Sequence, residues 1–162
     1  MLQAHELVPL VTLLKENNVS VLVDTAGCVP YSSFQKLNPF VVGYLFDFKT
    51  ADENKYREIG GNLELVIENI QRLLNDGIAV LIRIPLIPDF NTSLHSTQAI
   101  CKCLCDIGIK HVDLLPFHRL GSAKYEAMGL EYAYKTKQPL TKEELDKIES
   151  IYKTYFSVNT ER

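Results

Sequence analysis

The sequence predicts an α/β fold in which about four parallel β-strands are covered by helices. Apolar and β-branched runs alternate along the chain with segments whose apolar residues recur every three or four positions. The strand runs are almost continuously apolar, which is typical of strands buried in a parallel sheet. Alternation of strand and helix builds such a sheet through right-handed crossovers. The pattern alone fits both an open doubly wound sheet and an arc of a (β/α) barrel.

Four segments are predicted as strands. The first is rich in β-branched residues and is closed by Asp24-Thr25-Ala26-Gly27, where the glycine allows a tight turn. The third begins directly after a helix that stops at a glycine. The predicted strands are residues 19–23, 41–49, 78–87 and 111–117.

Five segments are predicted as helices from their periodicity and their capping residues. Asn62 and either Thr92 or Ser93 can accept hydrogen bonds from the first free N–H groups of a helix. Thr141 opens a Thr-Lys-Glu-Glu capping box. The second helix stops near Pro39, because a proline ring disfavours helical geometry in the residue before it. The predicted helices are residues 1–16, 31–37, 62–75, 92–106 and 141–155.

The composition indicates one globular domain over residues 1–162. This length supports one sizeable core and is too short to promise two. Hydrophobic residues make up 46%, charged residues 23%, and the net charge is −3, with no basic patch suited to nucleic acid or a membrane surface. No apolar run reaches the roughly 20 residues that a bilayer crossing needs, and no secretory signal opens the chain. A cytoplasmic location is expected.

The four cysteines are expected to be reduced. Cys101, Cys103 and Cys105 fall within one predicted helix, where alternate residues point far apart and cannot close disulfides with each other. A metal site is tempting, but Cys103 points away from the other two and no further ligand pair stands nearby. Buried structural thiols are the better interpretation. Cys28 follows a turn and receives no role.

Polar residues follow the predicted strands where ligand sites form in parallel α/β folds. The first strand ends with Asp24-Thr25, the second with Asp47 and Lys49, the third with Arg83 and the fourth with His118. These side chains should therefore meet at one mouth. Neighbouring carboxylates repel unless a cation joins them, and a metal ion or a ligand ammonium group could do so. The basic side chains suit a ligand carboxylate or ribose oxygens.

Other interpretations of the same residues stay open. The aspartates could cap turns, Lys49 and Arg83 could be surface charges, and His118 could bond a backbone carbonyl. A different enzyme class, a (β/α)-barrel aldolase or isomerase, could use Lys49 to form a Schiff base with His118 as acid and base. A non-catalytic module completed by a partner chain is a third possibility. Lys124 and Tyr125 belong to a loop that could fold over the mouth.

Five segments together resemble the activating enzymes of glycyl radical enzymes, of the pyruvate formate-lyase activating type, within the radical S-adenosylmethionine superfamily. The resemblance covers nearly the whole chain. The segments are Asp24-Thr25-Ala-Gly, Leu45-Phe-Asp47-Phe-Lys49, Gly60-Gly-Asn62, Ile82-Arg83-Ile-Pro85-Leu-Ile-Pro88, and Leu114-Leu-Pro-Phe-His118-Arg-Leu-Gly121 with Lys124-Tyr125.

This resemblance implies a partial, six-unit (β/α) barrel and therefore an arc rather than an open sheet. S-adenosylmethionine in such enzymes lies on a [4Fe–4S] cluster that a CxxxCxxC loop holds. Its reductive cleavage gives a 5′-deoxyadenosyl radical, which removes a hydrogen atom from a glycine of the partner, a glycyl radical enzyme. A flavodoxin or a ferredoxin-type protein is the implied electron donor.

The resemblance also implies roles for single residues. Asp47 and Lys49 match the D-x-K motif, whose lysine contacts the methionine carboxylate of the ligand. Arg83 and His118 match positions that face S-adenosylmethionine. A monovalent cation site beside that carboxylate is implied at Asp24, Thr25 and Asp47 with the carbonyl of Leu45.

The sequence also departs from the pattern of the family. It contains neither a CxxxCxxC loop nor a Gly-Gly-Glu-Pro segment, so it is expected to correspond to the C-terminal part of the barrel, to hold no cluster and to be inactive alone. Residues 19–23 should then expose an unpaired strand edge, which invites pairing. Asp89 stands where relatives usually have glycine.

Overall fold

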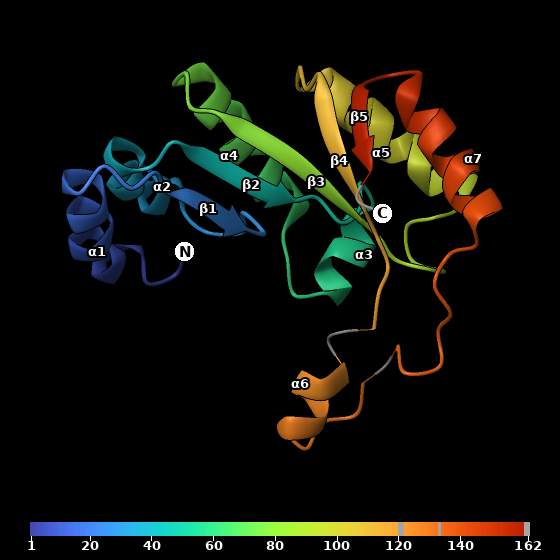
Figure 1. Ribbon diagram of the computed structural model, residues 1–162. Helices are drawn as coiled ribbons and strands as arrows, with labels where there is room; N and C mark the ends of the chain where they lie inside the picture. The colour runs from blue at the N-terminus through green and yellow to red at the C-terminus, as the bar shows by residue number, and fades with distance from the viewer. Residues whose placement is uncertain (120–121, 133, 161–162) are drawn as a thin grey trace.

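The computed structural model describes residues 1–119, 122–132 and 134–160, and it contains a five-stranded parallel sheet (Figure 1). The strands follow each other in chain order and each pairs in parallel with the next. The predicted fold class is confirmed, with one strand more than expected. The strands are β1 (Leu22–Thr25), β2 (Gly43–Asp47), β3 (Val80–Leu86), β4 (His111–Pro116) and β5 (Ser157–Thr160).

The fifth strand escaped prediction because its sequence carries little strand signal. Ser157–Thr160 is four residues long and alternates polar with apolar side chains, so it shows no apolar run. Parallel pairing with β4 still holds it, with His111 opposite Ser157 at the start of the ladder. Tertiary contact therefore decides the conformation of this segment, as is common for short strands.

The predicted helices are confirmed with small changes at their ends, and two short helices were not predicted. Asp52 caps one of these, α3, by accepting from the N–H groups of Asn54 and Lys55. The helices are α1 (Ala4–Glu16), α2 (Tyr31–Leu37), α3 (Glu53–Glu58), α4 (Leu63–Asn75), α5 (Leu94–Asp106), α6 (Ser122–Ala127) and α7 (Lys142–Lys153), with a 3₁₀ turn, η1 (Asn38–Phe40). None of the helices in the described part of the chain is both long and apolar enough to cross a membrane.

The predicted first strand, residues 19–23, begins too early. Asn18 adopts a left-handed backbone with a φ of 57°, and the N–H of Val19 bonds back to the carbonyl of Leu14. Residues just after this turn therefore finish the end of α1 instead of joining the ladder. The strand itself starts at Leu22, whose side chain is exposed. Within the described sheet β1 pairs only with β2, so the other edge of β1 is open, as expected.

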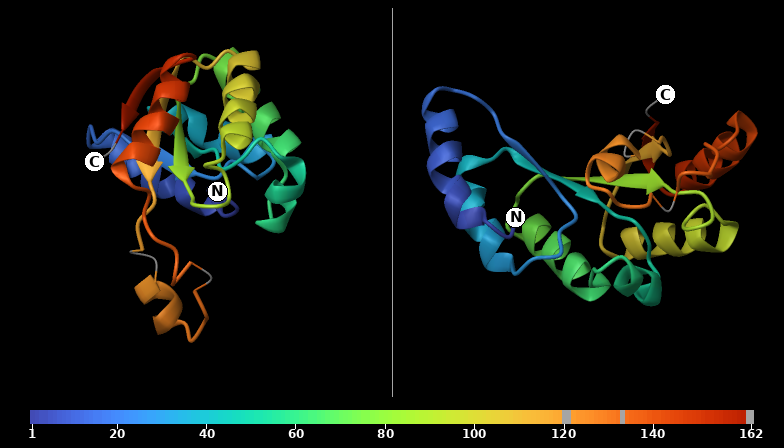
Figure 2. Two further views of the ribbon diagram at one scale, coloured as in Figure 1. Left: turned by 90° about the vertical axis from the view of Figure 1, so that its right-hand side faces the viewer. Right: turned by 90° about the horizontal axis from the view of Figure 1, so that it is seen from below.

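One face of the sheet is buried under helices and the other is open (Figure 2). Along β3, for example, Ile82 and Ile84 are fully buried, while the residues that precede them, Leu81 and Arg83, are only partly covered. Successive strand residues point to opposite faces, so one set enters the core and the other faces away from the helices. The result is an arc with helices along its outer side, as the barrel resemblance implied.

Aromatic side chains fill the core beneath β1 and β2. The rings of Phe34 and Phe46 stack with centroids 5.7 Å apart, and Tyr44 meets Phe34 edge to face. Gly27 lies directly against this cluster, since a Cβ there would stand 2.3 Å from a ring atom of Phe46. Together with its φ of 76°, this close approach requires glycine in the loop after β1.

A separate substructure, the α6 lobe (residues 117–140, of which 120–121 and 133 are not described), leaves the end of β4 and returns to α7. Figure 1 shows α6 hanging away from the sheet and its helices. None of its described residues has a fully buried side chain. An ion pair of 2.5 Å between Lys137 and Asp89 attaches it to the rest of the molecule, and the rings of Phe117 and Tyr134 are in contact within it.

Candidate functional site

The ladder brings the predicted charged residues to the open face of the sheet. Asp47, at the end of β2, lies opposite Arg83 of β3, and Asp24 of β1 lies opposite Leu45 of β2. Leu45 and Asp47 are two residues apart and share a face, so all four side chains project away from the helices. Arg83 is in the middle of β3 rather than at its end, because β3 extends beyond β2.

Arg83 joins the two carboxylates. Its Nη2 atom lies 2.6 Å from Oδ2 of Asp24 and 2.7 Å from Oδ1 of Asp47, and its Nε donates to the same Asp47 oxygen at 3.1 Å. Burial lowers the pKa of Arg83, but the hydrogen bonds and charges of Asp24 and Asp47 outweigh it and raise the pKa. The side chain of Arg83 is 18% exposed, so this network is screened less than a surface ion pair.

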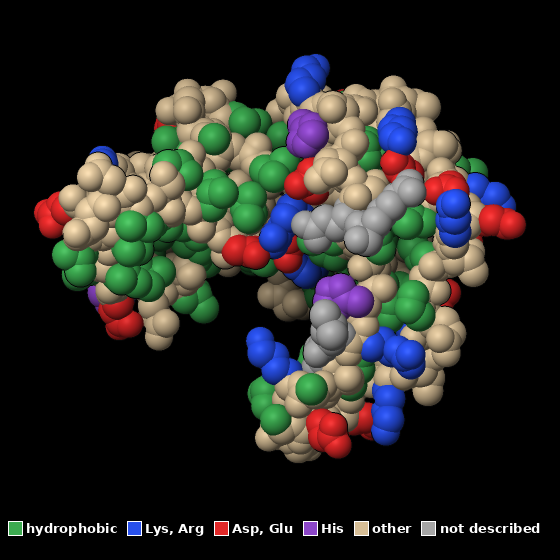
Figure 3. All heavy atoms as spheres, in the orientation of Figure 1, with side chains coloured by type: hydrophobic (Ala, Val, Ile, Leu, Met, Phe, Trp, Pro, Cys, Tyr) green, Lys and Arg blue, Asp and Glu red, His purple; other side chains and the backbone are tan. Residues whose placement is uncertain are grey.

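Lys49 completes the charged group. Its Nζ lies 3.6 Å from the second oxygen of Asp47, so the lysine and the aspartate point to the same side, as their spacing predicted. In Figure 3, acidic and basic side chains stand side by side above the hollow between the sheet and the α6 lobe. We call Asp24, Asp47, Lys49 and Arg83 the charged centre.

A buried asparagine that the sequence did not reveal fixes the backbone beside Lys49. Asn91 is 1% exposed, and its Nδ2 donates to the carbonyls of Lys49 at 2.8 Å and Pro85 at 2.7 Å. Its Oδ1 accepts from the N–H of Ile87 at 2.8 Å. One side chain thus ties the segment after β2 to the end of β3. No local pattern marks it, because its partners lie on two other segments.

His118 lies on an apolar cavity next to the charged centre. The cavity has a volume of about 390 Å³, and Asp47 and His118 are its ionisable lining residues besides tyrosines. This places the predicted histidine at the mouth with Asp47. Rings of the α6 lobe form much of the wall, with centroids of Tyr125 and Tyr132 5.0 Å apart. The lining residues are Asp47, Pro85, Leu86, Ile87, Leu115, Pro116, Phe117, His118, Tyr125, Tyr132 and Tyr134.

The prediction that the Lys124-Tyr125 loop faces the mouth holds for Tyr125, which lines this cavity from α6. Lys124 is on the same helix and is exposed. Tyr132 and Tyr134 were not predicted as site residues, because tyrosines scattered over a loop do not show which way they face.

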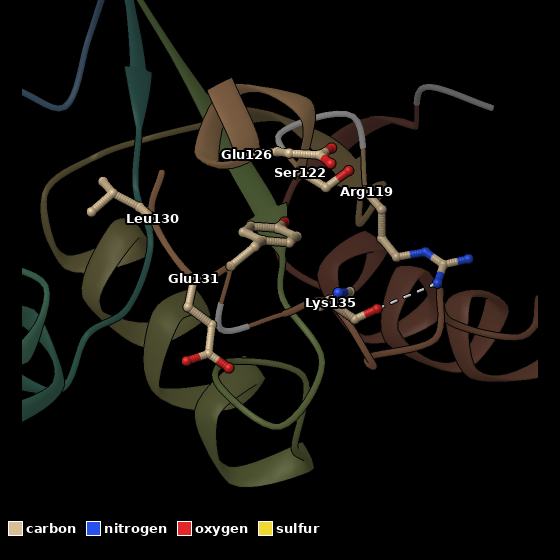
Figure 4. Close-up of a pocket in the computed structure, with 7 residues that line it drawn as sticks. Arg119, Ser122, Glu126, Leu130, Glu131 and Lys135 are labelled. Atoms are coloured by element: carbon tan, nitrogen blue, oxygen red, sulfur yellow. Dashed lines mark hydrogen bonds between the residues drawn. The ribbon is translucent and has the colours of Figure 1, made fainter. Parts of the chain in front are cut away.

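A second, larger hollow of about 500 Å³ lies within the α6 lobe itself (Figure 4). Arg119 reaches across it and donates to the carbonyl of Lys135 at 3.5 Å, while Glu126 and Glu131 line it from α6 and the segment beyond. Its walls consist of exposed or partly exposed side chains. The charges of this hollow are therefore solvated, whereas Asp47, Lys49 and Arg83 of the charged centre are 18–28% exposed.

The residues of the implied monovalent cation site do not form an open site in this arrangement. The guanidinium of Arg83 stands between Asp24 and Asp47, where a shared cation would have to lie. The hydroxyl of Thr25 accepts from the N–H of Gly27 at 3.0 Å. Leu45 lies in the ladder between β1 and β3. The cation assignment stays a prediction.

The cysteines are free and do not converge. Cys101 is fully buried on α5, and burial raises the pKa of its thiol to about 12, helped by the charge of Cys105. Among the described residues no group of three or more His, Cys, Asp or Glu side chains could hold a metal ion. The absence of a metal role for the cysteines stays a prediction.

Two solved structures share this fold, which is that of the radical S-adenosylmethionine partial barrels. One is the structure of a radical SAM methyltransferase from Sphaerobacter thermophilus, with a TM-score of 0.66 and 16% identity. The match covers 89% of this chain and 41% of the methyltransferase chain. The structure of a domain of a pyruvate-formate lyase-activating enzyme from Bacteroides vulgatus gives a TM-score of 0.80 at 18% identity, covering 99% of this chain and 92% of that one.

Sequence comparison identifies the protein family of the chain. It is 36% identical over 118 residues to the pyruvate formate-lyase 2-activating enzyme of Escherichia coli, which is 72% of this chain and 40% of that protein. The chain is therefore a relative of the glycyl-radical-enzyme activating enzymes, which confirms the resemblance found in its motifs. The chain spans 39 to 65% of the length of such curated relatives. No protein-family profile matches the chain.

Proposed function

We propose that this chain forms the ligand-binding arc of a radical S-adenosylmethionine activating enzyme for a glycyl radical enzyme. The observation that carries the proposal is the convergence of Asp24, Asp47, Lys49 and Arg83 on the open face of the sheet, in a relative of such activating enzymes. Lys49 binds the carboxylate of the methionine moiety, and the backbone tie through Asn91 keeps the lysine at that position.

The residues around the charged centre fit the rest of such a ligand. The cavity beside Asp47 combines apolar and aromatic walls with the imidazole of His118, which suits a nucleoside. Asp47 orients Lys49 through its second oxygen, and Arg83 supplies a second cation with a planar donor fork. When bound to a reduced [4Fe–4S] cluster, S-adenosylmethionine supplies the 5′-deoxyadenosyl radical that removes hydrogen from a glycine.

The described residues of this chain do not fit the cluster. Three of the four thiols are on α5, which packs on the helical side of the sheet, and Cys101 among them is buried. We therefore propose that residues 1–162 alone do not generate the 5′-deoxyadenosyl radical. The proposed partner of the whole activating enzyme is a glycyl radical enzyme of the pyruvate formate-lyase kind, with a flavodoxin or ferredoxin-type donor.

The aldolase or isomerase hypothesis gains no support from the geometry. A lysine that forms Schiff bases is activated by desolvation or by another cation nearby. Lys49 instead lies beside the carboxylate of Asp47 and is 28% exposed. The comparisons add weight to the activating-enzyme proposal, because the curated relatives carry that description.

Saturation-transfer NMR with S-adenosylmethionine tests the ligand site, since it detects binding as weak as millimolar. We expect signals from the methionine and adenosyl protons with the wild-type chain and their loss in Lys49→Met. Lys102→Met, which changes an exposed lysine on α5, serves as the matched control and should keep them. Equal signals in both variants, or none with the wild type, would contradict the proposed site.

Anaerobic reconstitution with iron and sulfide tests the second half of the proposal. We expect less than one cluster per chain by iron analysis and no 5′-deoxyadenosine after reduction. A stoichiometric cluster with turnover would show that the chain needs no further thiolates.

A further inference from the structure

A single guanidinium nitrogen holds both carboxylates of the charged centre. Nη2 of Arg83 is 2.6 Å from Asp24 and 2.7 Å from Asp47, so it stands midway between oxygens from two different strands. Arg83 reaches this place from β3 across β2, since Asp24 is on β1 and the strand between them carries Asp47, the register partner of Arg83. Only a long side chain can make this span.

The charge balance explains why this place needs a cation. Asp47 is 26% exposed and Asp24 58% exposed, so the first carboxylate in particular has lost much of its water. Two such groups facing each other repel unless a positive charge lies between them. Lys49 does not lie between the two carboxylates. Its Nζ is 3.6 Å from Oδ2 of Asp47, whereas Arg83 contacts Oδ1.

We propose that Arg83 is a built-in cation of the ligand-free chain, and that a monovalent metal ion reaches Asp24 and Asp47 only when Arg83 leaves them. The inference rests on the proposed function in one respect, that the predicted cation site shares these two aspartates. The guanidinium and the metal ion compete for the same oxygens, so occupation by one excludes the other.

This exclusion couples the cation to the ligand. A ligand that draws the guanidinium of Arg83 to its own anionic oxygens uncovers the two aspartates, and a cation bound there neutralises them. Binding of either partner then strengthens binding of the other by the same factor, as linkage requires. Arg83 is thus a positioning residue, because the movement of its guanidinium decides whether the cation can bind the two aspartates.

Thermal unfolding without any ligand tests the proposal, because it needs no activity. The wild-type chain is compared in potassium chloride and in choline chloride at equal ionic strength, and we expect the same Tm in both. Arg83→Met keeps the length of the stem and removes the charge. We expect a Tm several degrees higher in potassium than in choline for this variant, because the ion binds only the folded state.

Two further variants make the result specific. Arg83→Met combined with Asp24→Asn should lose the preference for potassium, since one of the two carboxylates is gone. Arg57→Met, which removes an exposed arginine paired with Glu53 on α3, should behave like the wild type. If Arg83→Met is too unstable to fold, Arg83→Gln, which retains hydrogen-bonding groups, takes its place.

A potassium-specific rise of Tm in the wild type equal to that in the variant would overturn the proposal, and so would no rise in either Arg83 variant. The NMR experiment with Lys49→Met reports the ligand site separately. If the wild-type chain gave no ligand signals while the Arg83 variant kept its potassium response, the proposed function would fail and the competition at Arg83 would stand.

Discussion

The sheet and the α6 lobe contribute the two halves of the candidate site in different ways. In the sheet, the ladder fixes the positions of Asp24, Asp47 and Arg83, and fully buried residues such as Phe46 and Ile82 lie beneath them. In the lobe no described side chain is fully buried, and ring contacts and an exposed ion pair hold it. The charged half of the site is therefore set by the fold, and the aromatic half by a weakly attached segment.

The largest expected effect distinguishes the two regions by stability. Phe46→Ala removes a fully buried ring that stacks on Phe34, and we expect a loss of about 3–5 kcal/mol in the free energy of unfolding. Tyr125→Ala removes an exposed ring of the lobe and should change it by less than about 0.5 kcal/mol. Urea unfolding followed by circular dichroism measures both. Similar losses would mean that the lobe folds as part of the core.

The next effect concerns the turn after β3, which carries both Asn91 and the partner of the lobe's ion pair, Asp89. Asn91→Ala leaves two partly buried carbonyls and one N–H without their partner, so we expect a loss of about 2–4 kcal/mol. Asn17→Ala removes one exposed side-chain bond to the carbonyl of Leu13 and should cost less than about 0.5 kcal/mol. Chemical denaturation of both variants gives the comparison. Equal values would show that the tie at Asn91 carries little of the stability.

A smaller effect should appear at high pH in the helices that cover the sheet. Burial raises the pKa of Tyr31 to about 12, helped by its 2.5 Å hydrogen bond to Asp76. The unfolded chain loses this proton near the ordinary value of 10.0, so folding stability should fall as the pH rises from about 10 to about 12. Below about pH 10 the contribution is fully present.

Tyr31→Phe should show a shallower decline over the same pH range, measured by thermal unfolding at each pH. Some decline remains, because burial also raises the pKa values of Tyr44, Tyr56 and Tyr152. An unchanged slope in Tyr31→Phe would assign the whole pH response to the other tyrosines.

The smallest expected effect concerns the attachment of the lobe. Asp89→Asn breaks the ion pair with Lys137, and exposed pairs of this sort contribute less than about 1 kcal/mol. We expect unchanged unfolding but faster chymotryptic cleavage at the lobe tyrosines. Glu68→Gln, which breaks an exposed pair with Arg72 on α4, is the control and should leave the cleavage rate unchanged. Equal cleavage in both would show that the pair does not restrain the lobe.

Much of the sheet was predictable because parallel strands follow simple geometry. Apolar runs located four strands, and the two-residue period correctly placed Asp47 and Lys49 on one side. The convergence of Asp24, Asp47 and Arg83 followed from the rule that strand ends share an edge. The sequence could not show that Arg83 lies mid-strand, since this depends on how far β3 extends beyond β2.

The remaining features depend on contacts that no local pattern records. Asn91 looks like an ordinary loop residue, and its importance comes from carbonyls at Lys49 and Pro85. The direction of Tyr132 and Tyr134 depends on how the lobe meets the ends of β3 and β4. β5 is a strand only because β4 offers a free edge to pair with.

Asp89 combines an unfavourable backbone conformation with an ion pair that fastens the lobe. Its backbone has a φ of 62°, a conformation that favours glycine, yet its carboxylate is what meets Lys137. A glycine would ease the turn and leave the lobe without this fastening. The same turn carries Asn91, which donates to the carbonyl of Lys49, so the fastening of the lobe and the support of the charged centre lie two residues apart.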